Sequence, residues 1–186
     1  MVSFERRHRV WVYDDLAQEH EPLELDLPET ITRLPGNDGI ETITFLPDGR
    51  LLMIAEEPAS TGTTIDAWIL EDDLTWRWVG YIMRDGFSVT DATALPDGRI
   101  IVLERWFAAP MSLRIRLREL TPAMLDSGAP LDGVPTVLFK QNLIIDNFEG
   151  LDHRIGPKGE IFLYMISDDN FALLQATYLY QFRLDP

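Results

Sequence analysis

The chain has 186 residues, of which 46% are hydrophobic and 10% aromatic, and this is the composition of one globular domain with a sizeable core. Asp and Glu number 31 against 16 Lys and Arg, so a net charge of −15 argues against nucleic acid as a partner. The absence of cysteine excludes disulfides, zinc–thiolate sites and thiol nucleophiles.

The first residues do not read as a targeting segment. Charges interrupt Met1–Arg7 before an apolar core can form, so this segment does not resemble a signal peptide. No apolar run approaches the roughly 20 residues that a membrane helix needs. We therefore expect no membrane span, and we expect the polypeptide as it stands to remain where it is made.

Strand patterns dominate the chain, and helical periodicity is nearly absent. In chain order the expected strands fall into four groups: 2–6, 9–14 and 22–27; 40–45, 50–56, 64–70 and 75–83; 90–95, 99–105, 113–120 and 135–141; and 147–153, 160–167 and 176–184. Within 113–120, apolar residues alternate with arginines, which predicts a strand with one wet face. Only Pro122–Asp126, after the cap candidate Thr121, resembles a helical turn.

One turn sequence recurs between these strands. Leu46–Arg50 returns as Leu95–Arg99 and, more loosely, as Gly156–Glu160, at spacings of 49 and 61 residues. Proline presets φ, aspartate bonds its own backbone and glycine supplies a positive φ, so we assign Asp48 and Asp97 to turn formation. Recurrence at this length predicts a propeller or an array of sheets.

These patterns predict an all-β fold, a partial β-propeller with four-stranded antiparallel blades. A single domain over 1–186 would hold two complete blades and two incomplete ones, in segments of about 1–30, 37–84, 88–143 and 146–186. A β-sandwich or open meander is the competing interpretation, because regular short strands with Pro-Gly turns are equally expected there. Open sheet edges invite association. We therefore expect either that residues precede Met1 in the native protein or that two copies pair as a homo-oligomer to close the ring.

Blocks of sequence that contain the recurring turns resemble a known bacterial family. They are Asn37–Arg50, Thr90–Arg105, Asp146–Leu151 and Ile166–Phe171, and their order and spacing are similar to the family called esterase-like activity of phytase. Val2–Trp11 is similar to an internal block, so the resemblance covers essentially the whole chain but only the C-terminal portion of the family. The resemblance implies a propeller and an exported or periplasmic parent, whereas this chain shows no export signal.

An acidic residue precedes each recurring turn in the incoming strand: Glu41, Asp91 and Glu149. The first strand of each propeller blade lines the central channel, so we expect these carboxylates to converge on one axis. Converging carboxylates repel one another unless they are protonated or bridged by a cation, and hard oxygen ligands suit Ca²⁺ or Mg²⁺. Acidic residues at strand ends also commonly face solvent, and both interpretations stay open.

Further polar residues near the same strand ends complete the candidate site. Asp168 and Glu104 are the candidate catalytic residues, with Asp168 as base, and Arg105 and Asn170 are the candidates for substrate binding. A metal-activated water would hydrolyse a small-molecule ester or phosphoester, although a polyanionic substrate would need bridging cations. No Gly-x-Ser-x-Gly elbow occurs, so serine-esterase chemistry is not expected. The alternative function is a non-catalytic propeller that binds a ligand or a protein.

Overall fold

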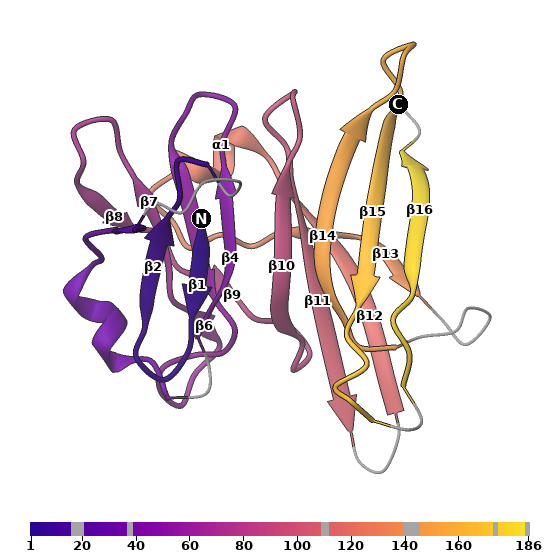
Figure 1. The fold of residues 1–186 in the computed structure, drawn as a ribbon, viewed down its shortest axis with the longest axis horizontal. Helices are drawn as coiled ribbons and strands as arrows, with labels where there is room; N and C mark the ends of the chain where they lie inside the picture. Colours follow the sequence, from indigo (N-terminus) through magenta and orange to yellow (C-terminus); the bar gives the residue numbers. More distant parts are fainter. Residues whose placement is uncertain (16–20, 37–38, 109–111, 140–145, 173–174, 185–186) are drawn as a thin grey trace.

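The computed structural model describes residues 1–15, 21–36, 39–108, 112–139, 146–172 and 175–184. Short antiparallel sheets make up the molecule, with the two N-terminal sheets overlapping at one end of the view and the C-terminal sheet at the other (Figure 1). Parts of the predicted segments, at 16–20, 37–38, 109–111, 140–143, 173–174 and 185–186, lie outside the described residues. Within the described ranges, no helix is long and apolar enough to cross a membrane.

Four main sheets account for most of the strands. The first has the order β1 (Val2–Phe4), β2 (Arg9–Val12), β3 (Leu23–Glu24); the second β4 (Ile40–Phe45), β5 (Leu51–Ala55), β7 (Ala67–Leu70), β8 (Trp76–Trp78); the third β10 (Ser88–Ala94), β11 (Ile100–Ala108), β12 (Ser112–Leu120), β13 (Val134–Phe139); and the fourth β14 (Phe148–Ile155), β15 (Ile161–Ser167), β16 (Leu179–Leu184). A separate pair is formed by β6 (Thr64–Ile65) and β9 (Tyr81–Ile82).

Two expected strands are broken where the sequence predicted continuous ones. The segment 64–70 divides into β6 and β7, and 75–83 divides into β8 and β9. Gly80 has φ +61°, and the N–H groups of Val79 and Gly80 both donate to the Ala67 carbonyl, at 2.9 and 3.4 Å. A positive φ that glycine tolerates bends the chain here and ends the β7–β8 ladder. The first part of 64–70, β6, then pairs with the second part of 75–83, β9, beside the main sheet.

The recurring turns share one geometry. The N–H of Leu46 donates to the carbonyl of Arg50 at 2.8 Å, and the N–H of Leu95 donates to that of Arg99 at 2.7 Å. Gly49 and Gly98 have φ of +96° and +87°, as these tight turns require. The helical turn is also present as α1 (Pro122–Leu125), but its N-cap Thr121 makes no side-chain capping bond. A short 3₁₀ helix (Glu29–Arg33), absent from our predictions, follows the first sheet.

The core is built where neighbouring sheets face one another. The first strands of the second, third and fourth sheets, β4, β10 and β14, are neighbours across these seams. One buried apolar cluster includes Met53, Ile54, Trp68 and Val102. A second, between the last two main sheets, contains residues of β11, β12, β14 and β15. Burial on both faces explains why β5 is apolar throughout.

The prediction of a wet arginine face on β12 holds for Arg114, which is exposed, and is wrong for the other two arginines. Arg116 and Arg118 are only 5% and 0% exposed, because their face of the third sheet packs against β9 rather than against solvent. Their charges are balanced inside this seam by carboxylates, chiefly Glu104 of the adjacent strand β11. Strict alternation correctly separated the two faces of the strand, but it could not show that a second sheet covers the polar one.

Candidate active site

Each of the strands β4, β10 and β14 contains a β-bulge near one end. The register with the second strand shifts between Ile40 and Thr42 in β4, between Val89 and Asp91 in β10, and between Phe148 and Gly150 in β14. The unpaired residues are therefore Glu41, Thr90 and Glu149. A bulge re-aims the side chain of the extra residue and is common beside active sites. Glu41 and Glu149 thus occupy equivalent places, as predicted from the turns, but the third place belongs to Thr90.

Arg105, in β11, is the centre of a polar cluster at this end of the sheets. Its Nη2 donates to Glu56 Oε1 at 3.0 Å, and its Nη1 donates to Glu149 Oε1 at 2.9 Å and to the Asn147 side-chain carbonyl. Asn147 Nδ2 donates in turn to Glu149 Oε1 at 2.5 Å. We call the residues Glu41, Glu56, Arg105, Asn147 and Glu149 the Arg105 cluster.

The acidity of Glu41 is strongly perturbed. Burial, together with the negative charges of Glu56, Glu5 and Glu149, raises the pKa of Glu41 to about 7, although Arg105 acts in the opposite direction. A carboxyl group with this pKa is divided between its acid and base forms near neutral pH. Proton transfer is most effective when the pKa of the catalytic group lies close to the working pH. The arrangement therefore suits Glu41 for general acid–base catalysis.

Asp91 is directed away from the other two predicted ligands. One oxygen of its carboxylate accepts the N–H of Leu151 on β14, at 2.7 Å, and the other accepts the N–H of Ala92, at 2.8 Å. Burial raises the pKa of Asp91 to about 6, although these N–H donors favour the ionised form. Asp91 thereby links two neighbouring sheets. Counting back from the first two turns could have revealed the offset of Asp91, since Glu41 and Thr90 precede Leu46 and Leu95 by five residues each. The count does not extend to the third turn, which Glu149 precedes by seven residues.

Glu104, a predicted catalytic residue, lies in the buried seam. Its side chain is 0% exposed and accepts bonds from Tyr81 Oη at 2.8 Å, Arg116 Nε at 2.6 Å and Arg118 Nη1 at 3.2 Å. Burial and the adjacent Glu104 carboxylate raise the pKa of Tyr81 well above its ordinary value. Successive residues of a strand point to opposite faces. This is why Glu104 and Arg105, although adjacent in sequence, belong to different networks.

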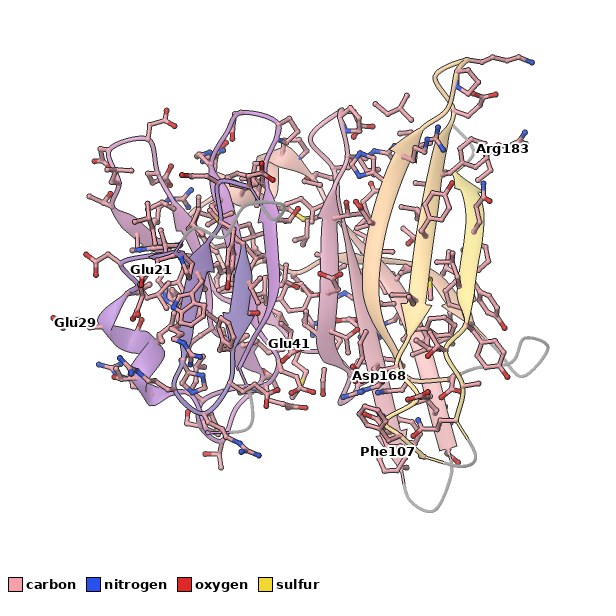
Figure 2. The ribbon with its side chains drawn as sticks, viewed as in Figure 1. Glu21, Glu29, Glu41, Phe107, Asp168 and Arg183 are labelled. Atoms are coloured by element: carbon pink, nitrogen blue, oxygen red, sulfur yellow. The ribbon has the colours of Figure 1, made fainter. Side chains whose placement is uncertain are left out.

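The predicted residues of the third hairpin lie in the turn after β15. Figure 2 places Asp168 and Glu41 towards the same end of the sheets. The Asp168 N–H donates to the Asn147 carbonyl at 2.9 Å, so its backbone adjoins the Arg105 cluster, while its exposed carboxylate accepts the Asn170 N–H at 3.0 Å. Asn170 is exposed and has φ +48°, so its bond to Asp168 closes a local turn.

The acidic side chains predicted to bind a divalent metal are mostly engaged by donors of the protein itself. Among the described residues, no group of three or more His, Cys, Asp or Glu side chains is arranged to hold a metal ion. Glu149 and Glu56 share a guanidinium, and the Asp91 oxygens are bound to backbone N–H groups. The positive charge between the carboxylates is supplied by Arg105. The described side chains therefore do not fit the predicted Ca²⁺ or Mg²⁺ site.

Sequence reasoning missed part of the cluster. Asn147 was not singled out, although it bonds both Arg105 and Glu149. Glu56 and Asp168 each follow the second strand of a hairpin. The Glu56 N–H donates to the Gly39 carbonyl and the Asp168 N–H donates to the Asn147 carbonyl, and each acceptor lies just before the first paired residue of the first strand. Arg105 pairs with Ser88 at the corresponding place in the third sheet. Aligning the hairpins at this end would have placed Glu56, Arg105 and Asp168 together.

The arrangement of sheets defines the class of protein. A thermostable family-43 glycoside hydrolase, which has a β-propeller fold, matches with a TM-score of 0.50 at 15% identity, over 82% of this chain and 50% of that chain. A protein of unknown function from Bacteroides caccae matches with a TM-score of 0.41 at 13% identity, over 88% and 50%. The prediction of an all-β partial propeller is confirmed. The chain spans about half the length of these solved proteins.

The family follows from the sequence. The family model described as Phytase-like, esterase-like activity of phytase, matches residues 1–171. The chain belongs to this family, as its resemblance predicted. No curated protein is similar enough to the chain to count as a relative.

Proposed function

We propose that the protein hydrolyses a small-molecule ester or phosphoester at the Arg105 cluster, with Glu41 as general base. The observation that carries this proposal is a partly buried carboxyl group with a pKa of about 7, surrounded by Glu56, Glu5 and Glu149 and near Arg105. Membership of the Phytase-like family supports hydrolysis as the reaction class. General acid–base catalysis by one such group contributes about 10²–10⁴-fold to a rate.

The reaction can be written with the residues of this cluster. Ionised Glu41 accepts a proton from water as the water oxygen forms a bond to the ester carbon or to phosphorus. The bond to the leaving oxygen then breaks, and the proton held by Glu41 passes to that oxygen. The products are an acid and an alcohol, and Glu41 returns to its ionised form. Arg105 keeps the neighbouring carboxylates of Glu56 and Glu149 bound while the charge on Glu41 changes.

Dependence on Ca²⁺ or Mg²⁺, expected from the sequence, stays a prediction with its own test. Because the described acidic side chains form no metal cluster, the mechanism above takes no step through a metal ion. A ligand that binds only the folded state raises its stability in proportion to the logarithm of its concentration. Thermal melting in chloride salts of Ca²⁺ and Mg²⁺, compared with NaCl of equal ionic strength, measures this directly. Stabilisation specific to the divalent ion, lost in Glu41→Gln, would restore the metal-site hypothesis.

The experiment for hydrolysis uses chromogenic 4-nitrophenyl carboxylic esters and 4-nitrophenyl phosphate. We expect turnover of at least one substrate, and we expect Glu41→Gln to lower kcat/KM by about 10²-fold or more because the amide cannot accept the proton. Glu29→Gln is the matched control. Glu29 is exposed and lies at the opposite side of the molecule from Asp168 (Figure 2), so its variant should retain wild-type activity. Full activity in Glu41→Gln would refute the assignment.

A further inference from the structure

The Arg105 guanidinium connects side chains that come from three different sheets. Arg105 itself belongs to β11 in the third sheet. Its Nη2 bonds Glu56, which follows β5 of the second sheet, at 3.0 Å, and its Nη1 bonds Glu149 of β14, in the fourth sheet, at 2.9 Å. The Asn147 side chain, beside the start of β14, is a further acceptor. One side chain therefore spans both seams that flank the third sheet.

These bonds engage the guanidinium at both terminal nitrogens. The side chains of Arg105, Glu56 and Glu149 are 21%, 18% and 38% exposed, so the ion pairs are shielded from bulk water on most sides. Asn147 orients the same Glu149 oxygen that Arg105 bonds. A planar guanidinium holds two carboxylates in a defined geometry, which a flexible ammonium group cannot reproduce. An anionic substrate group would therefore have to share the charge of Arg105 with two carboxylates that it already binds.

We infer that Arg105 is a positioning residue and not the substrate anchor that the sequence suggested. This inference rests on the proposed function. By bonding Glu56 on one side and Glu149 with Asn147 on the other, Arg105 holds in one arrangement the charged groups that surround the general base.

Four charged groups from four different segments act on Glu41. They are Glu5 after β1, Glu56 after β5, Glu149 in β14 and Arg105 in β11. The three carboxylates favour protonated Glu41, and Arg105 favours the ionised form. Removing the guanidinium therefore has two effects. It withdraws a positive charge that favours the base form, and it releases two carboxylates from their fixed positions.

The test compares Arg105→Gln, Arg105→Lys and the control Arg99→Gln. Arg99 is a suitable control because it precedes the same strand β11 at the other end of the hairpin and is also paired with two carboxylates, Asp97 at 2.8 Å and Glu119 at 3.0 Å. The first measurement is a ¹³C NMR titration of the Glu41 side-chain carboxyl, which needs no turnover. The second is the pH profile of kcat and KM on the ester that the wild type hydrolyses.

We expect Arg105→Gln to raise the titration midpoint of Glu41 by about one pH unit and to lower kcat about tenfold below that midpoint, with KM little changed. Arg105→Lys, which keeps the charge, should restore the midpoint but not the full kcat. Arg99→Gln should leave both unchanged. A raised KM with an unchanged kcat and midpoint would overturn the inference in favour of substrate binding, and an unmoved NMR midpoint in Arg105→Gln would also overturn it. Absence of turnover in the wild type would instead contradict the proposed function.

Discussion

The Glu104→Gln substitution would remove a completely buried carboxylate from between two arginines. Glu104 accepts bonds from Arg116 at 2.6 Å and Arg118 at 3.2 Å. Deleting one partner of a buried ion pair costs about 3–5 kcal/mol, because the remaining charge is left uncompensated away from water. In this network each arginine keeps a second carboxylate, Asp85 at 2.9 Å or Asp132 at 2.7 Å. We therefore expect the lower end of the range, a loss of about 3 kcal/mol in the free energy of unfolding.

Urea unfolding followed by tryptophan fluorescence measures this loss, and Glu119→Gln supplies the control. Glu119 pairs with Arg99 at a partly exposed site, so its loss should cost at most about 1 kcal/mol. A loss for Glu104→Gln no larger than that of the control would refute the argument from burial. The same variant separates a structural role from the catalytic one that the sequence suggested. If Glu104 acts through stability alone, the activity per folded molecule should be unchanged.

Two further predictions concern the stability of the whole domain. Because burial raises the pKa of Glu41 to about 7 and that of Asp91 to about 6, the native state binds more protons than the unfolded chain between about pH 4 and pH 7. The free energy of unfolding should therefore fall as pH rises through this window. Glu41→Gln should flatten this dependence of the unfolding free energy on pH, measured by urea unfolding. The same slope in the variant and the wild type would contradict the raised pKa of Glu41. Gly80→Ala should cost about 1–3 kcal/mol, since Gly80 has φ +61° and an added Cβ would lie 2.8 Å from the Trp78 ring. Gly62→Ala, where nothing lies within 4 Å, is the control in thermal melting, and equal melting temperatures would disprove the steric argument.

Local chemistry made the strands and turns predictable. Pro-Asp-Gly sets the dihedral angles of its own turn, and period-two alternation assigns side chains to the two faces of a strand without reference to the rest of the chain. For this reason the hairpin turns after Phe45 and Ala94 were expected where they occur. The breaks at Asp66 and Gly80 were not, because they arise where the β6–β9 pair forms beside the second main sheet.

What the sequence alone determined about this protein is its family, its all-β class and the carboxylates at the ends of the first strands. Only the tertiary structure decided which of them meet. A one-residue bulge placed Glu41 and Glu149 in equivalent positions and left Asp91 bound to backbone N–H groups. The partners of Arg105 come from sheets that precede and follow its own, and no spacing along one strand encodes a contact across two seams.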